Sequence, residues 1–213
     1  MGPRSATLLR PADRGNVQVL PNVFADDELL ALVRRGGGTA AAVVYDRFGD
    51  DVNRIVGRLL GPDADHDDVV HDAFVQILRG LPRLREAAAL RGFVRAVTIN
   101  TVRSELRRRR FRRAFWSSDE APEPTDDALD PESRETLRRI YAILDRLAAD
   151  LRIAFTLRFV ERHSLAEVAT MTGCSLATAK RRIARATHRF TELAHADDDL
   201  ATRITGGTPW PAE

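Results

Sequence analysis

The chain has 213 residues and nearly balanced charge, with 33 Lys and Arg against 31 Asp and Glu, a length that suits one domain or two small ones. No apolar run approaches the ~20 residues needed to span a bilayer, and the N-terminus lacks the apolar stretch of a secretory signal. Cys174 is the only cysteine, which excludes an intrachain disulfide and fits a reducing compartment. We therefore expect a soluble cytoplasmic protein without membrane insertion.

Charge is strongly segregated along the chain. A dense arginine run occupies residues 103–113, and a cluster of Asp and Glu follows directly over residues 119–135. Blocks of opposite sign indicate a polyanionic partner for the basic run and a separately charged linker after it. From the run alone, a nonspecific RNA-binding patch is an equally good interpretation.

The helical spacing of apolar residues along the chain predicts an all-α protein. Residues 1–24 form a polar tail with several prolines, which we expect to be disordered. Apolar residues then recur at helical spacing in four segments, with breaks at Gly36–Gly38, Gly61-Pro62 and Pro82. The segments cover roughly residues 26–35, 39–60, 65–80 and 90–113, with a loop over residues 83–89.

A second helical unit follows an acidic stretch. Residues 114–134 are rich in Pro, Ser, Asp and Glu and show little periodicity, which predicts a flexible linker. Residues 135–195 return to helical spacing, and residues 196–213 are again polar and expected to be disordered. The prediction is thus two small helical modules, 25–113 and 135–195, joined by a flexible acidic tether.

The end of the second module predicts a helix-turn-helix. Ser164 with Glu167 forms a capping box for a first helix, and Gly173 stands where the chain must leave that helix. Ser175 can cap a second helix. Apolar residues at helical spacing predict its inner face: Leu176, Ala179, Ile183, Ala186 and Phe190.

The opposite face of that second helix is cationic, carrying Thr178, Lys180, Arg181, Arg182, Arg185 and Arg189. A short helix, a glycine turn and a basic second helix are what reading the major groove of DNA requires. The competing interpretation is an ordinary helical hairpin with a solvated arginine-rich surface.

Two stretches resemble one family. The sequence DADHDDVVHDAFVQILRGLPRLREAAALRGFVRAVTINTVRSELRRRR, residues 63–110, is similar to region 2 of the sigma-70 family, in its extracytoplasmic-function group. Residues 147–190, LAADLRIAFTLRFVERHSLAEVATMTGCSLATAKRRIARATHRF, are similar to region 4. The resemblance implies a sigma factor that binds core RNA polymerase and directs promoter recognition, −10 strand opening and transcription initiation, without catalysis or a cofactor of its own.

The resemblance also implies partners and site residues. Expected partners are the clamp of the largest polymerase subunit, the polymerase flap, promoter DNA and an anti-sigma factor. Core-polymerase contacts fall on Asp67, Asp68, Asp72 and Gln76. Contacts with the −10 element fall on Arg83, Leu84, Arg85, Glu86, Asn100, Arg103, Arg107 and Arg108. Contacts with the −35 element fall on Ser175, Thr178, Lys180, Arg181, Arg182 and Arg185.

Three positions depart from the family pattern. Phe93 stands where members often have tryptophan, Thr98 where they often have alanine, and Thr172 at a usually apolar place in the helix-turn-helix. Because the ring at position 93 is smaller, strand melting is the function that these departures affect most.

Two other functions are compatible with parts of the chain. A stand-alone helix-turn-helix regulator would bind duplex DNA without polymerase. A metal-dependent enzyme is suggested by His66, Asp67, Asp68, His71 and Asp72. The two histidines are five residues apart, however, and do not share a helix face as an i,i+4 pair would. We therefore predict no metal and no catalytic residues.

Overall fold

The computed structural model describes residues 24–36, 38–61, 65–115, 130–197 and 200–201. Within these residues every regular element is helical and no strand occurs, which confirms the all-α prediction. Residues 1–23 of the predicted N-terminal tail, most of the acidic linker and most of the C-terminal tail lie outside the described residues.

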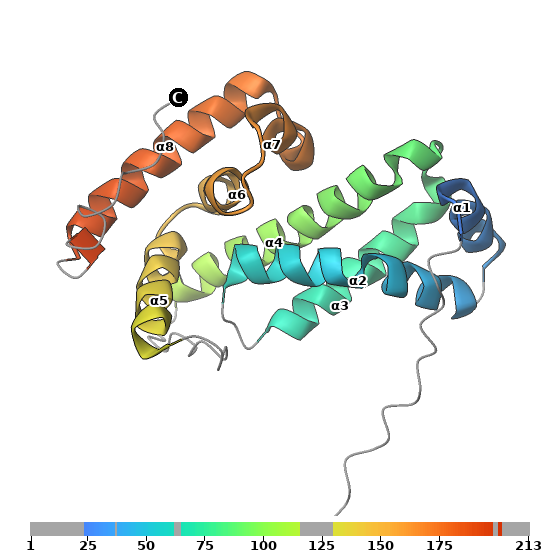
Figure 1. The fold of residues 1–213 in the computed structure, drawn as a ribbon, viewed down its shortest axis with the longest axis horizontal. Helices are drawn as coiled ribbons and strands as arrows, with labels where there is room; N and C mark the ends of the chain where they lie inside the picture. Colours follow the sequence, from blue (N-terminus) through green and yellow to red (C-terminus); the bar gives the residue numbers. More distant parts are fainter. Residues whose placement is uncertain (1–23, 37, 62–64, 116–129, 198–199, 202–213) are drawn as a thin grey trace, which may run out of the picture.

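Four helices form the first module: α1 (Asp26–Arg35), α2 (Gly38–Leu60), α3 (His66–Gly80) and α4 (Leu90–Phe115). Their boundaries lie close to the predicted ones, at the glycines and proline that break helical geometry. The predicted loop contains two short 3-10 turns, Leu81–Arg83 and Ala87–Ala89. In Figure 1, α2, α3 and the long α4 run alongside one another, and α1 crosses one end.

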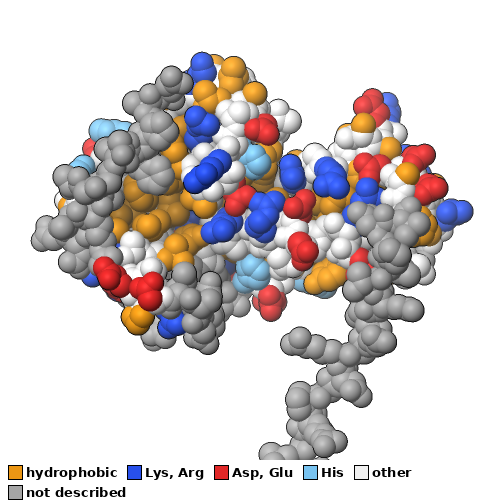
Figure 2. Space-filling view, in the orientation of Figure 1, with side chains coloured by type: hydrophobic (Ala, Val, Ile, Leu, Met, Phe, Trp, Pro, Cys, Tyr) orange, Lys and Arg blue, Asp and Glu red, His pale blue; other side chains and the backbone are white. Residues whose placement is uncertain are grey.

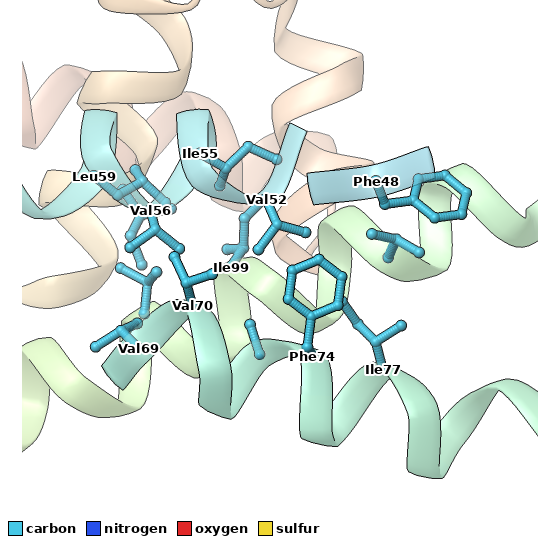
Figure 3. Close-up of a cluster of buried hydrophobic side chains, with 14 of the residues drawn as sticks. Phe48, Val52, Ile55, Val56, Leu59, Val69, Val70, Phe74, Ile77 and Ile99 are labelled. Atoms are coloured by element: carbon cyan, nitrogen blue, oxygen red, sulfur yellow. The ribbon is translucent and has the colours of Figure 1, made fainter. Parts of the chain in front are cut away.

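The core of this module lies between α2, α3 and α4. Phe48 of α2, Ile77 of α3 and Ile99 of α4 are at most 2% exposed. Figure 3 shows their side chains among those of Val52, Val56 and Phe74. Burial of this apolar surface provides the main driving force for packing three helices together.

The second module contains α5 (Pro131–Asp145), α6 (Ala149–Phe155), α7 (Leu165–Thr172) and α8 (Leu176–His195), and α6 continues into a π-helical turn, Thr156–Val160. Asp130 caps α5 by accepting the Ser133 N–H at 2.9 Å. Helix α5 therefore begins inside the predicted linker of residues 114–134, since Pro at the first helical position and Asp before it start a helix well.

The helix-turn-helix has the predicted local geometry. The Ser164 hydroxyl accepts the Glu167 N–H, and the Glu167 carboxylate accepts the Ser164 N–H. Gly173 has φ 64°, a left-handed conformation that costs glycine little, and Ser175 caps α8 through the Thr178 N–H. The inner face of α8 is also as predicted except for Leu176, which is 47% exposed because it is the first residue of the helix.

Two polar residues that depart from the family pattern are buried without loss of hydrogen bonding. The Thr98 hydroxyl donates to the Val94 carbonyl at 2.9 Å, and the Thr172 hydroxyl donates to the Val168 carbonyl at 2.7 Å. Each satisfies its polar group within its own helix, a bond that threonine forms readily at i−4.

The two modules pack against each other. Helices α6 and α7 lie against α4, and α6–α8 stand over the first module in Figure 1. Buried side chains of both modules, including Val102 of α4, Ile153 of α6 and Val168 of α7, belong to one continuous apolar cluster. The simple picture of two modules on a tether is therefore incomplete, since apolar and polar contacts join them directly.

Candidate nucleic-acid interface

Helix α8 presents exposed cations at Arg189, which pairs with Glu192 at 3.0 Å, and at three positions nearer its start, Lys180, Arg181 and Arg185. Lys180, Arg181 and Arg185 form no ion pair with another residue in the part of the chain that the structure describes. Of the predicted polar contacts on α8, Ser175 is exposed and Thr178 is partly buried. The hydroxyls of those two residues lie 3.0 Å apart at the start of the helix. The N-terminal half of α8 can thus offer guanidinium and ammonium donors to an anion.

Arg182 differs from its neighbours. Its side chain is 27% exposed and its Nη2 atom lies 3.8 Å from Oδ2 of Asp150. It therefore points toward the junction with the first module, although the sequence pattern placed it on the same cationic face as Arg181.

Asp150 also holds two arginines of α4. Its Oδ1 lies 2.9 Å from Nε of Arg103, and its Oδ2 lies 2.9 Å from Nη2 of Arg107. Arg103, predicted as a contact with the −10 element, is 15% exposed and also contacts Asn100 and the Thr172 carbonyl. Burial lowers the pKa of Arg103, and the Asp150 carboxylate opposes that shift. Basic and acidic side chains alternate across this middle part of the molecule in Figure 2.

The rest of the basic run is partly neutralised by one nearly buried carboxylate. Glu105 is 8% exposed and accepts from Nε of Arg108 and Nε of Arg109, both at 2.7 Å, and from Arg112 at 3.3 Å. The hydrogen bond with Glu105 raises the pKa of Arg108. Arg107 and Arg108 are still 63% and 61% exposed, so both can contact a phosphate from the solvent side.

The predicted −10 loop is open to solvent. Arg83, Arg85 and Glu86 are exposed, whereas Leu84 is partly buried and packs against the core of the first module. The Leu84 carbonyl accepts from Arg34 Nη2 of α1 at 2.5 Å, which fixes the loop. Asn100 is exposed on α4, about 15 Å along the helix from Leu90 at the usual rise per residue.

The predicted polymerase contacts are exposed on α3: Asp67, Asp68, Asp72 and Gln76. A groove of about 630 Å³ runs between α3 and α4, lined in part by Asp72 and Gln76 on one side and by Asn100 and Arg108 on the other. Phe93 lines the same groove. The structure thus places candidate contacts for polymerase and for DNA on opposite walls of one groove.

The histidine and aspartate residues of α3 do not gather as metal ligands. A ring nitrogen of His66 lies 3.3 Å from Oδ1 of Asn53, and His71 is exposed. No group of three His, Cys, Asp or Glu side chains in the described segments is arranged to hold a metal ion. Among the described helices, none is both long enough and apolar enough to cross a membrane.

Sequence reasoning missed the residues that join the modules. Arg152 is 2% exposed at its side chain and pairs with Asp145, and Glu161 pairs with Arg54 and Arg58. A usable signal was present, because Arg152 interrupts an otherwise apolar stretch of α6 and a buried arginine needs a partner.

The chain matches two family models in order. Residues 44–112 match the model described as Sigma-70 region 2, and residues 137–187 match Sigma-70, region 4. The ECF RNA polymerase sigma-E factor of Escherichia coli strain K12 is 30% identical over 175 residues, covering 76% of this chain and 91% of that protein. The RNA polymerase sigma-H factor of Pseudomonas aeruginosa is 25% identical over 172 residues, covering 76% and 89%.

Solved structures agree with this relationship. CnrH, determined in complex with the cytosolic domain of CnrY, superimposes with a TM-score of 0.56 and 26% identity, covering 82% of this chain and 99% of that one. The sigma factor RpoE from Bartonella quintana, determined with the anti-sigma factor NepR, shares the fold at a TM-score of 0.50 and 20% identity, covering 80% and 97%. The chain therefore belongs to the extracytoplasmic-function group of the sigma-70 family.

Proposed function

We propose a division of the promoter between the two modules of this sigma factor. Membership of the family makes the chain a subunit that binds core RNA polymerase and directs promoter recognition, −10 strand opening and transcription initiation. The family consists of initiation factors rather than enzymes, and the chemistry remains with the polymerase. The cytoplasm, where polymerase acts, is the expected location.

The first module would bind both polymerase and the −10 element. The acidic side chains of α3 would dock on the clamp of the largest subunit, and complementary charge would guide that encounter. The loop around Arg83–Glu86 would hold a base that has left the stack, since only an unstacked base exposes its pairing edge to a protein pocket. Arg107 and Arg108 would contact phosphates beside it, adding affinity that falls with salt.

The second module would bind the −35 element. Helix α8 would lie in the major groove, and the other surfaces of the module would face the polymerase flap. Arg181 and Arg185 are the strongest candidates for guanine contacts, because both are exposed and an arginine can bond bidentately to a guanine edge. Lys180 would contact a phosphate as a point charge.

The observation that carries this proposal is the match to region 2 and region 4 in the order of a sigma factor. A stand-alone regulator would need only the helix-turn-helix and would leave the region 2 match without a role. Two related structures contain a partner bound to the sigma chain, CnrY or NepR, and we expect an anti-sigma partner for this chain as well.

The polymerase contact can be tested by removing charge from α3. We expect the double variant Asp68→Asn/Asp72→Asn to bind core polymerase about ten-fold more weakly, a loss of ~1.4 kcal/mol, as measured by titration of labelled chain and by co-elution in gel filtration. The matched control is Asp46→Asn/Asp50→Asn, which removes the same charge at the same i,i+4 spacing from exposed positions on α2. If both double variants bind core polymerase equally weakly, the net charge of the chain, rather than the α3 surface, controls docking.

A further inference from the structure

Glu105 is a carboxylate set into the middle of the basic run of α4. Its side chain is 8% exposed, although glutamate is rarely buried unless it is paired. The partners are arginines three, four and seven residues further along the helix, Arg108, Arg109 and Arg112. These spacings bring side chains onto one face of an α-helix, so α4 by itself gathers three guanidinium groups around one carboxylate.

The carboxylate of Glu105 holds the three arginines differently. Arg109 is 11% exposed and also reaches Asp65, at the residue before α3, with Nη2 3.3 Å from Oδ2. Arg112 lies farther from Glu105 and is 45% exposed. Arg108 donates to Glu105 through Nε at 2.7 Å, while 61% of its side chain is exposed. Arg109 thus ties α4 to the start of α3, whereas Arg108 remains at the surface.

The guanidinium of Arg108 is anchored at one end and open at the other. Its bond to Glu105 uses Nε, and neither Nη group has a hydrogen-bond partner among the residues that the structure describes. The Nη groups carry most of the N–H donors of an arginine, in a planar fork that fits phosphate oxygens. Arg108 also lines the groove between α3 and α4 with Asn100, so its open donors lie beside another residue predicted to contact the −10 element.

We propose that Glu105 is a positioning residue that gives the −10 contact its specificity through Arg108, a role that rests on the proposed contact of Arg108 with phosphates. An arginine that is already held loses less side-chain freedom when it binds a phosphate. Because phosphate contacts fix the register of a protein on DNA, a held arginine meets its phosphate in one register only. A mobile arginine can follow the backbone of any sequence. Glu105 thereby favours promoter over unrelated DNA.

Glu105 also limits nonspecific attraction. Its negative charge lies within hydrogen-bond reach of three arginines that would otherwise all be available to a polyanion. Phosphate binding releases counterions, so each cation that becomes available raises the affinity for all DNA and steepens its salt dependence. One nearly buried carboxylate therefore acts on both affinities: it strengthens the contact made in the correct register and weakens contacts made elsewhere.

A purely structural role for Glu105 has different consequences. Glu105, Arg109 and Asp65 link α4 to α3, and this link stabilises the first module whether or not DNA is bound. Loss of the link lowers the free energy of unfolding, which urea unfolding measures, and leaves the promoter preference of the folded chain unchanged. The readout that separates the two roles is the ratio of promoter to nonspecific affinity, together with the salt dependence of each.

The test uses the complex of the full chain with core polymerase. Its binding is measured across a range of salt to a promoter fragment that it transcribes and to an unrelated duplex of equal length. Glu105→Gln keeps the size of the side chain and removes its charge. We expect the ratio of promoter to nonspecific affinity to fall about two- to ten-fold, as for one side chain that must be immobilised on binding. The slope of log K against log salt on the unrelated duplex should steepen by about 1.

Two further variants show whether Glu105 acts through Arg108. In an Arg108→Ala background, Glu105→Gln should change the ratio by less than about two-fold, because residues that act as a unit are not additive. Glu105→Asp retains the charge on a shorter side chain, so the ratio should fall while the salt slope stays at the parent value. The matched control, Asp46→Asn, removes one charge from an exposed position of α2 and should keep both the ratio and the slope.

An unchanged ratio for Glu105→Gln, in a complex that still transcribes from promoters, would overturn the positioning role and leave the structural one. An equal fall in the Arg108→Ala background would also overturn it, since Glu105 would then act without Arg108. If Glu105→Gln does not fold, Arg108→Ala alone decides: it must lower the ratio, and an unchanged ratio contradicts the role. Failure of the parent complex to bind any promoter would instead contradict the proposed function, and the role of Glu105 with it.

Discussion

Replacing Arg181 and Arg185 together with alanine is expected to reduce binding of the polymerase complex to a promoter duplex by roughly 10- to 100-fold, because a bidentate guanine contact contributes ~1–3 kcal/mol of discrimination. Both side chains are exposed on α8, and no described carboxylate pairs with them. The measurement is a titration of duplex DNA carrying the −35 element, at several salt concentrations.

The control for this variant removes two exposed cations elsewhere in the second module, Arg146→Ala and Arg162→Ala. It should change affinity by less than the α8 variant at every salt concentration. If a replaced arginine reads a base, discrimination between promoter and unrelated duplex will fall. If both contact only phosphates, binding will weaken equally on all sequences and the slope of log K against log salt will shrink by about 2. Unchanged binding of the α8 variant would remove α8 from the interface.

The largest expected effect on stability is that of Phe155→Ala. Phe155 is 1% exposed and stacks on Phe190 of α8, with ring centroids 4.6 Å apart. Removing the ring is expected to lower the free energy of unfolding by ~3–5 kcal/mol, a large part of the ~5–15 kcal/mol that holds a domain folded. Because Phe190 loses a stacking partner on α6, α8 would be held less firmly for DNA binding.

Urea unfolding followed by circular dichroism measures this loss. Phe111→Ala is the control, since this ring is 66% exposed and such surface changes usually stay within ~0.5 kcal/mol. Similar losses for the two variants would contradict the assignment of Phe155 to the core of the second module.

The helices were predictable where local chemistry determines them. Gly36, Pro82 and Gly173 end or separate helices because of their own backbone preferences, and the capping box at Ser164 depends only on residues within one turn. The predicted start of the second module at Glu135 lies after the observed start of α5 at Pro131. The acidic composition before Glu135 is typical of a linker, and it outweighed the capping signal of Asp130.

The state of the candidate site was less predictable, because contacts distant in sequence determine it. Arg103 and Arg107 belong to a run that reads as uniformly basic, yet Asp150 lies more than 40 residues away in sequence and pairs with both. Arg152 likewise bonds to carbonyls of α2 that precede it by 92 and 93 residues. Spacing along one helix indicates which side chains share a face, but it does not indicate which carboxylate will lie opposite them.

The most direct test of the central claim is run-off transcription with purified core polymerase on a pool of genomic promoter fragments, with and without this chain. As a sigma factor the chain will co-elute with core polymerase and produce new transcripts with defined start sites, whose upstream sequences share −35 and −10 elements. Salt-sensitive binding to duplex DNA by the chain alone, with no co-elution and no new transcripts, would contradict the assignment and indicate a stand-alone regulator.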